Sequence, residues 1–302
     1  MFDIIIIGGG AAGASAAVIA ARNKRNVLLL DKGAEFSGLG LAVQVSDLPG
    51  IEGVAGSEAL SRMKKQAVTL GAEVNNATVM SCVISDGAKR VVTNEPVNYD
   101  CKAIILATGN MPHQESHVYQ GEKELRGKGI SHDVENDAPA TRHASVALVG
   151  KSVQAAEDAL KLSEFAEMVY WVIPASKLDI PPELKSKLEE TKRIEPLFSS
   201  SLKKINGATE VTSISVLSQG QERTVSVKYV FLPPQQYKPV TDYLNNTGVQ
   251  TSPEGVVLVN QQFETSVPGV FAAGNILCLK PQLNVVCAAQ GAIAALNAEK
   301  RL

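Results

Sequence analysis

The chain has 302 residues, a length that allows about two domains of ordinary size. It carries 29 Lys and Arg against 31 Asp and Glu, a formal net charge of −2, and 45% of its residues are hydrophobic. This composition excludes a disordered or fibrous protein, and it lacks the basic excess that binding to nucleic acid requires. The 4 cysteines cannot staple a chain of this length, so we expect a reducing, cytoplasmic setting.

An apolar run over residues 4–21 contains no charged residue and approaches the length of a membrane helix. Four of its residues, however, are glycines, and the nearby basic residues follow the run instead of preceding it, as they would in a signal peptide. The run therefore predicts a buried strand over 3–7, a glycine turn and a helix over 11–22, with no membrane insertion.

The other expected elements follow from apolar runs and helical periodicity. In chain order they are a strand over 26–30, a helix over 57–70, β stretches over 74–84 and 90–97, a strand over 103–106, a strand over 146–149, a helix over 153–165, a strand over 168–173, a polar β meander over 210–231 and a helix over 282–300. Two strand–turn–helix starts indicate an α/β protein with two Rossmann-like nucleotide-binding domains.

The first turn, residues 8–13, reads GGGAAG and satisfies the G-x-G-x-x-G pattern. Gly8 would permit the tight turn, Gly10 would let the backbone approach a pyrophosphate, and Gly13 would let helix and strand pack closely. The phosphates would then lie at the helix N-terminus, with Asp31 at the end of the next strand placed to accept hydrogen bonds from a ribose. The alternative is a turn that merely needs glycine.

Five stretches carry a resemblance to a known family: residues 4–13, 47–50 (DLPG), 104–109 (IILATG), 121–131 and 264–275 (ETSVPGVFAAGN). Over nearly its whole length the chain resembles the low-molecular-weight thioredoxin reductases, which are FAD-dependent pyridine nucleotide-disulfide oxidoreductases. The resemblance implies a homodimer whose subunits have two three-layer ββα domains. Residues 1–112 and 245–302 would bind FAD, and residues 113–244 would form the second nucleotide domain.

The resemblance also implies which residues contact FAD. The expected contacts are Gly8, Gly10, Ala11, Ala12, Gly13, Asp31, Lys32, Leu39, Asp47, Val79, Ala107, Thr108, Gly109, Gly274 and Asn275. Asn275 replaces an aspartate of the family, and since an amide can still accept a hydrogen bond, flavin binding should survive the change. Asp47 matches an asparagine near the flavin ring.

The chain departs from the family where a redox-active Cys-x-x-Cys is expected. After residues 129–132 (GISH), these positions are Asp133, Val134, Glu135 and Asn136. Because thiol–disulfide exchange requires a thiolate, electrons could not leave the flavin by that route.

The second nucleotide motif, residues 150–155 (GKSVQA), is also altered. Ser152 stands where the backbone should come closest to a pyrophosphate, and its Cβ is an obstacle. The segment after the next strand offers neither arginines for a 2′-phosphate nor an acid for a ribose, with only Lys177 nearby. We therefore expect weak or absent NAD(P)H use, unless unusual residues substitute. Pro233 and Pro234 should stiffen the link between the domains.

Few other residues are candidates for chemistry. Cys278 and Cys287 could form a redox pair beside the flavin, or they could be small buried hydrophobes. Cys82 and Cys101 are expected in the core. His132, next to the missing disulfide, could move protons or contact a substrate, but an exposed loop residue is the simpler interpretation. His113 and His117 have a metal-like spacing in a loop, where we expect no metal site.

Three functions remain open. The first is a flavin oxidoreductase that takes electrons from a donor such as ferredoxin or a reduced quinone, with an undefined acceptor. Its vacated nucleotide site could hold another planar ligand, such as a second flavin. The second is a flavoprotein that binds FAD for stability or sensing without turnover. The third is an NAD(P)H-dependent reductase with unorthodox contacts.

Overall fold

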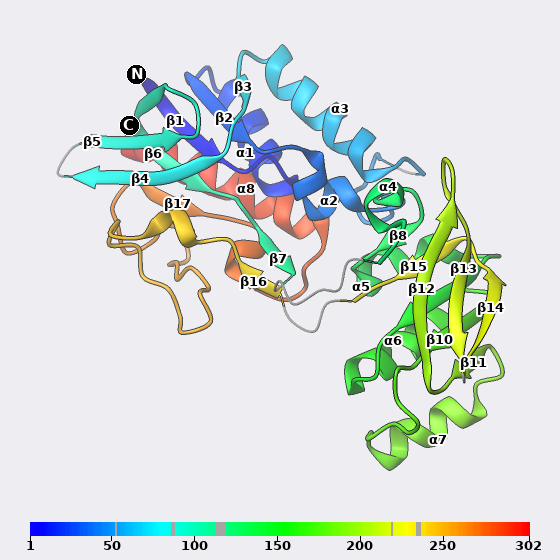
Figure 1. Cartoon of the computed structure of the whole chain (residues 1–302). Coiled ribbons are helices and arrows are strands. Elements are labelled where there is room, and N and C mark those ends of the chain that lie inside the picture. The colour runs from blue at the N-terminus through cyan, green and yellow to red at the C-terminus, as the bar shows by residue number, and fades with distance from the viewer. Residues whose placement is uncertain (52, 86–87, 113–118, 219, 234–236) are drawn as a thin grey trace.

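A computed structural model describes residues 1–51, 53–85, 88–112, 119–218, 220–233 and 237–302. Two units lie side by side, each built on its own parallel sheet (Figure 1). The first unit contains both ends of the chain, and the second is formed by its middle. The expected α/β fold with two Rossmann-like units is confirmed.

The first sheet has seven strands in the order β3-β2-β1-β6-β5-β4, with β17 also beside β6. The pairs β4–β5 and β5–β6 are antiparallel, and the other pairs of the described strands are parallel. The strands are β1 (Phe2–Ile7), β2 (Val27–Asp31), β3 (Glu73–Asn76), β4 (Val79–Ser85), β5 (Ala88–Thr93), β6 (Asn98–Leu106) and β17 (Val270–Ala272).

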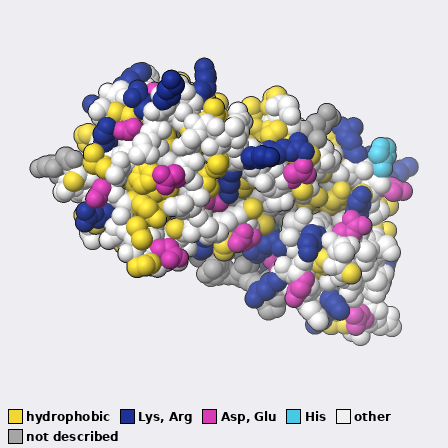
Figure 2. All heavy atoms as spheres, turned by 90° about the horizontal axis from the view of Figure 1, so that it is seen from above, with side chains coloured by type: hydrophobic (Ala, Val, Ile, Leu, Met, Phe, Trp, Pro, Cys, Tyr) yellow, Lys and Arg dark blue, Asp and Glu magenta, His cyan; other side chains and the backbone are white. Residues whose placement is uncertain are grey.

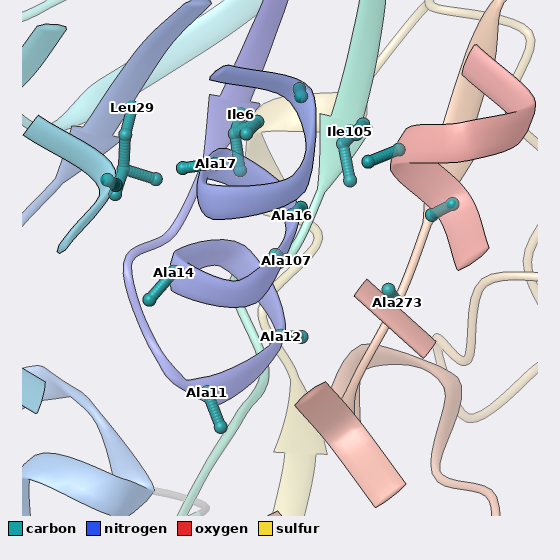
Figure 3. Packing of buried hydrophobic residues seen from close by; sticks show 14 of the residues in the cluster. Ile6, Ala11, Ala12, Ala14, Ala16, Ala17, Leu29, Ile105, Ala107 and Ala273 are labelled. Carbon is teal, nitrogen blue, oxygen red and sulfur yellow. The ribbon is translucent and has the colours of Figure 1, made fainter. Parts of the chain in front are cut away.

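Three helices cover one face of this sheet: α1 (Ala11–Arg22), α3 (Gly56–Thr69) and α8 (Asn284–Ala298). The central strand β1 is buried on both faces, which explains its unbroken isoleucine run. Most of the buried residues of α1 are alanines, and their small side chains let the helix lie close to Ile6 and Ile105 (Figure 3). The apolar run over residues 4–21 is thus a strand, a turn and a helix, and none of the described helices is long and apolar enough to cross a bilayer.

The second sheet is parallel, in the order β11-β10-β9-β15-β8. Helix α6 packs on one face and an antiparallel sheet, β12-β13-β14, covers the other, which makes three layers. The elements are β8 (Ile130–Ser131), β9 (Ser145–Val149), α6 (Val153–Ser163), β10 (Met168–Val172), α7 (Pro182–Glu190), β11 (Ile194–Leu197), β12 (Ser200–Gly207), β13 (Val211–Ser218), β14 (Gln221–Ser226) and β15 (Tyr229–Phe231).

The two passages between the units pair with each other. Strand β7 (Asn110–Pro112) leaves the first unit, and β16 (Tyr237–Pro239) runs antiparallel beside it on the return. Tyr243 and Leu244 already pack in the core of the first unit, slightly before the predicted boundary at 245. Of the two prolines expected to stiffen this link, Pro234 lies outside the described residues.

The remaining described helices are short. They are α2 (Gly38–Leu41), α4 (Glu122–Leu125), α5 (Val134–Asp137) and the 3₁₀ turns Ala34–Phe36, Ala138–Thr141, Asp242–Leu244, Asn275–Leu277 and Glu299–Arg301.

Four expected β segments are wrong in their limits. The stretch over 74–84 is divided at residues 77–78 into β3 and β4. Residues 94–97 form a bend instead of continuing β5, and β6 begins at Asn98 because its polar first half pairs antiparallel with β5. The meander begins at Ser200, ten residues earlier than expected, since its first strand alternates polar and apolar residues only weakly.

Candidate cofactor site

The predicted FAD contacts come from four separate stretches that the parallel sheet brings to one edge. Gly8 follows β1, Asp31 ends β2, Ala107 follows β6 and Gly274 lies two residues beyond β17. The carboxyl ends of parallel strands meet at the same edge, where nucleotide-binding folds hold their ligands. Three backbone hydrogen bonds align the four ends: Gly8 N donates to Leu30 O, Ala107 N to Ile7 O and Ala273 N to Leu106 O.

The glycine loop has the geometry that its sequence predicts. Gly8 has φ +99°, and a Cβ there would lie 2.4 Å from the carbonyl oxygen of Ala107. A Cβ on Gly13 would lie 1.8 Å from Gly8 O, so only glycine allows this contact between helix and turn. At Gly10, by contrast, the nearest atom to a Cβ would be Ser37 Oγ at 3.2 Å. The space beside Gly10 is therefore available for a ligand.

The N-terminus of α1 suits an anionic ligand. Its N-cap, Gly10, makes no side-chain capping hydrogen bond. The first N–H groups of a helix have no partner within the helix, and together with the helix dipole they favour negative charge. The loop and the uncapped helix therefore fit the pyrophosphate of a dinucleotide such as FAD.

Asp31, the residue expected to contact a ribose, is held by partners at both carboxylate oxygens. Its Oδ1 accepts a hydrogen bond from Gly9 N at 2.9 Å, and its Oδ2 is paired with Nζ of Lys64 from α3. Each carboxylate oxygen has two lone pairs, so both can accept a further hydrogen bond. Sequence reasoning missed Lys64, although a lysine on the apolar side of a helix was a readable signal.

The opposite side of the site is fixed by α8. Gly274 N donates to Oε1 of the buried Gln290 at 2.9 Å, and Asn275 Oδ1 accepts from Cys287 Sγ at 3.2 Å. A Cβ on Gly291 would lie 2.0 Å from Ala12 O, so α8 and α1 pack backbone against backbone.

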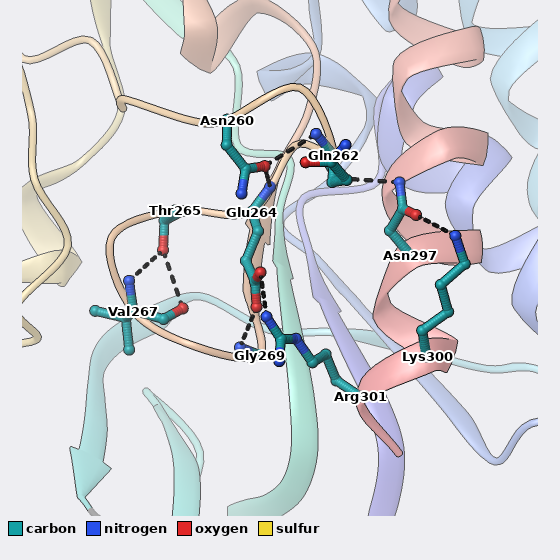
Figure 4. A network of polar contacts seen from close by, with 9 residues as sticks. All are labelled: Asn260, Gln262, Glu264, Thr265, Val267, Gly269, Asn297, Lys300 and Arg301. Carbon is teal, nitrogen blue, oxygen red and sulfur yellow. Dashed lines mark hydrogen bonds and ion pairs between the residues drawn. The ribbon is translucent and has the colours of Figure 1, made fainter.

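The loop that leads into β17 is tied to the end of the chain. Glu264 accepts hydrogen bonds from Gly269 N and from the guanidinium of Arg301, at 2.9 and 2.8 Å (Figure 4). Asn297 of α8 donates to Gln262 O in the same network. These contacts orient β17 and hence the Gly274–Asn275 pair.

Asp47 caps α8, a role that the sequence did not indicate. Its two oxygens accept hydrogen bonds from the backbone N and the side-chain Nδ2 of Asn284, at 2.5 and 3.0 Å. The helix has no side-chain cap from its own N-cap residue, Leu283. A carboxylate at this end is favourable because it faces the positive end of the helix dipole.

The other expected contacts lie on several elements. Thr108 Oγ1 donates to Val240 O at 2.8 Å, and Gly109 has φ +69°. Leu39 is buried in α2, and Val79 begins β4. Lys32 is solvent-exposed, with its Nζ 4.2 Å from the centre of the Phe36 ring.

All four cysteines are free thiols. Cys82 and Cys101 are buried, as expected, and burial raises the pKa of each to about 12. Burial, with Asp47 nearby, also raises the pKa of Cys287 to about 11. Cys278 donates to the backbone oxygen of Asn275 at 3.4 Å, and burial raises its pKa as well. Since the thiolate is the reactive form, the raised pKa values of the buried Cys287 and the partly buried Cys278 favour unreactive thiols over a redox pair.

His132 is not the exposed loop residue that we expected. Its side chain is 20% exposed, and its Nδ1 lies 2.8 Å from the carbonyl oxygen of Leu232. Tyr237 OH donates to His132 O at 2.6 Å. The reason is tertiary: β15 and β16 close over a residue that follows the very short strand β8.

Helix α5, which begins next to His132, faces the first unit. Asn136 Nδ2 donates to Gln282 O at 3.3 Å, and Glu135 pairs with Lys280 at 3.5 Å. Asp133 caps the helix by accepting from Asn136 N. The positions matched to Cys-x-x-Cys therefore lie against the segment that precedes α8.

Asp137, the last residue of α5, is a buried acid that sequence reasoning missed. It is only 3% exposed, and its Oδ1 has no hydrogen-bond partner among the described residues. Burial raises its pKa to about 7. Asp137 is thus a titratable group next to the surface where the two units meet.

The second nucleotide loop differs from the first. Ser152 is the N-cap of α6, and its Oγ accepts from Ala155 N at 3.1 Å. One of the N–H groups that would face a pyrophosphate is therefore already satisfied. A cavity of about 280 Å³ lies beyond the carboxyl ends of β9 and β10, lined by residues that include Val149, Pro174 and Lys203.

The described residues contain no group of three or more His, Cys, Asp and Glu side chains placed to hold a metal ion. His113 and His117 lie outside the described residues.

Comparisons with known proteins agree with this geometry. The family model for pyridine nucleotide-disulphide oxidoreductases matches residues 2–291. Thioredoxin reductase of Aquifex aeolicus is 34% identical over 100% of this chain and 94% of its own length. The crystal structure of thioredoxin reductase from Streptococcus pyogenes covers 100% of this chain and 98% of its own, with 25% identity and a TM-score of 0.86. A thioredoxin reductase structure from Gloeobacter violaceus is 31% identical, covers 99% of this chain and 93% of its own, and has a TM-score of 0.57. The chain therefore belongs to the pyridine nucleotide-disulphide oxidoreductase family and is an FAD-dependent oxidoreductase with a thioredoxin reductase-like fold.

Proposed function

We propose that this oxidoreductase passes electrons through FAD without a dithiol and draws them from a donor other than NAD(P)H, such as ferredoxin. The observation that carries the proposal is the chemistry of α5. This helix lies against the first unit at Gln282, yet its matched positions are Asp133 and Asn136. Neither side chain can take part in disulfide exchange, which requires a thiolate.

FAD, when bound, supplies the two-electron chemistry, and the protein sets its position and surroundings. The glycine loop and the N-terminus of α1 would hold the pyrophosphate, and Asp31 would accept from the adenosine ribose. Gly274 and Asn275, fixed by Gln290 and Cys287, would contact the flavin half.

The second nucleotide loop supports weak or absent use of NAD(P)H. Ser152 adds a Cβ where the backbone should approach a pyrophosphate, and its hydroxyl occupies an N–H group of α6. Lys177 is exposed, and Trp171 Nε1 donates to Gly150 O within the loop. The Ser152 hydroxyl and the Gly150 carbonyl thus already have hydrogen-bond partners within this unit.

The cavity beyond β9 and β10 leaves room for part of a different planar ligand, and a second flavin is our candidate. Its volume of about 280 Å³ is close to the lower end of the range for small-molecule sites.

By the family resemblance we further propose a cytoplasmic homodimer.

The donor can be identified by mixing the purified yellow protein anaerobically with NADPH, NADH and reduced ferredoxin in turn. Loss of the visible absorbance band of oxidised flavin reports the uptake of electrons. We expect rapid bleaching by ferredoxin and slow or no bleaching by either nicotinamide. Rapid bleaching by NADPH would restore the NAD(P)H-dependent reductase, and failure of every donor would favour a non-catalytic flavoprotein.

A matched pair of variants tests the role of the second loop. Ser152→Gly removes both the Cβ and the hydroxyl, whereas Ser152→Ala keeps the Cβ. We expect bleaching by NADPH to become faster in Ser152→Gly only.

A flavin-to-protein ratio near two would support the second flavin, and a ratio near one would contradict it.

A further inference from the structure

Lys64 occupies an unusual position for a lysine. It lies on the side of α3 that faces the core, where Leu60 and Ala67 are buried and Met63 is partly buried. The spacing of these residues is that of one helical face. The two other cations nearby, Arg62 and Lys65, are exposed to solvent.

The Lys64 ammonium reaches the carboxyl edge of the first sheet. Its Nζ pairs with Asp31 Oδ2, and the two side chains are only 19% and 11% exposed. Asp31 Oδ1 is held by Gly9 N, and a Cβ on Gly9 would lie 2.6 Å from Asp31 Cγ. The carboxylate is therefore fixed at both oxygens and packed against the glycine loop.

The pair is not explained by stability alone. Replacing a buried ion pair with apolar side chains of similar size is often neutral or stabilising, because two charges must be removed from water. On the apolar face of α3, a methionine would pack as well as the lysine stem. A charged residue at this position therefore points to a role at the edge that it reaches.

We infer that Lys64 is a positioning residue for the adenosine half of the flavin dinucleotide. It orients the Asp31 carboxylate so that the free lone pairs of both oxygens point to where the ribose hydroxyls would bind. It also offsets the negative charge of Asp31, which would otherwise oppose the diphosphate at the N-terminus of α1. This inference rests on the proposed placement of FAD in the glycine loop.

The ion pair could stabilise the fold or position the cofactor, and a stability measurement alone does not distinguish these two roles. A structural pair would lower the stability of the apoprotein when it is broken. A positioning pair would lower FAD affinity even in the double variant, where no charge is left buried alone and the apoprotein keeps most of its stability. Lys64 and Asp31 would also act as one unit, so their effects on affinity would not multiply.

The experiment compares FAD dissociation constants and apoprotein melting temperatures for the wild type, Lys64→Met, Lys64→Arg, Asp31→Asn and the double variant Asp31→Asn/Lys64→Met. We expect Lys64→Met to weaken FAD binding by about 10–100-fold, the equivalent of one charge-assisted hydrogen bond. Lys64→Arg should recover most of the affinity. The double variant should be no weaker than the worse single variant. Lys65→Met, on the exposed side of the same helix, is the control and should bind FAD like the wild type.

Two results would overturn the inference. One is FAD affinity of Lys64→Met within about threefold of the wild type. The other is a loss of affinity that is matched by a loss of apoprotein stability and is not recovered in Lys64→Arg. If the wild-type protein itself bound no FAD, the placement of the cofactor would fail, and that outcome is distinct from both.

Discussion

At the scale of single residues, the site depends on the space that each glycine leaves where another residue would have its Cβ. Gly13 is filled on its Cβ side by the backbone of Gly8, whereas Gly10 faces mostly empty space. At Gly38, in the nearby helix α2, an added Cβ would have no atom within 4 Å, and the backbone conformation is open to other residues. The backbone therefore requires glycine at position 13, the space for a ligand requires it at position 10, and neither requires it at position 38.

Substitutions at these glycines should separate folding from cofactor binding. Gly10→Val should fold but lose bound FAD, because its side chain would occupy the ligand's space. Gly13→Ala should be strongly destabilised, since its Cβ would overlap Gly8 O. Gly38→Ala serves as the control with neither effect. The ratio of flavin to protein absorbance and the melting temperature report the two properties, and stoichiometric FAD in Gly10→Val would contradict the assignment of the loop.

Asp137 makes stability depend on pH. Its pKa rises from an ordinary 3.8 to about 7 on folding because it is buried. The folded state therefore binds more protons than the unfolded state between these values, so stability should fall as pH rises from about 4 to 7. Asp137→Asn should flatten this slope and stabilise the protein at pH values above about 7.

Melting temperatures across this pH range test the prediction. Asp158, whose pKa burial raises to about 6, contributes a slope of the same sign, so the comparison is between variant and wild type. The exposed Asp242 provides the control Asp242→Asn. An unchanged slope in Asp137→Asn would show that another group titrates.

At the scale of elements, the helix N-termini are completed in different ways. Helix α1 has no side-chain cap, α6 is capped by its own Ser152, and α8 is capped from a distant loop by Asp47. Only the first leaves its N–H groups to a ligand. The absence of a side-chain cap on α1 and its presence on α6 thus distinguish the candidate cofactor site from the second nucleotide loop.

Removal of the distant cap should destabilise α8. In Asp47→Ala, the backbone N and the Nδ2 of Asn284 lose their acceptor, which should cost about 1–2 kcal/mol. Chemical denaturation of the apoprotein measures this loss. Asp179→Ala, at an exposed aspartate, is the matched control, and equal stability of the two variants would contradict the capping role.

At the scale of the whole molecule, the two units meet through the paired strands β7 and β16 and through α5. On the face shown in Figure 2, basic and acidic side chains are interspersed, as the net charge of −2 suggests. The ion pair between Glu135 and Lys280 is largely exposed and should contribute little. With FAD placed as proposed, the second unit would reach the cofactor through the position of α5 and not through a strong ion pair.

Restoring thiols in α5 tests this relation. In Asp133→Cys/Asn136→Cys, we expect a disulfide to form after oxidation, because the side chain of residue 133 already lies over the backbone of residue 136. An anaerobic dithionite titration should then consume one more two-electron equivalent than the wild type. Asp133→Ser/Asn136→Ser is the control. A variant disulfide that never accepts electrons would show that α5 does not communicate with the flavin.

Much of the fold was readable from the sequence. The isoleucine run, the glycine loop and the alanine-rich helix are local signals, and each led to the correct element. The second strand–turn–helix start indicated the second unit, and the family resemblance added the loop before β17. The weakest expectations were at polar strands, such as the first half of β6 and β12, whose pairing depends on neighbours far along the chain.

The sequence by itself determined the class of fold, the nucleotide loop and the absence of cysteine at residues 133–136, because these depend on residue type and short spacing. Only the tertiary structure decided the partners of the polar groups. It joined Lys64 to Asp31, Asp47 to α8 and α5 to the first unit, and it buried Asp137. Such pairs bring together residues from distant elements, and no local pattern records them.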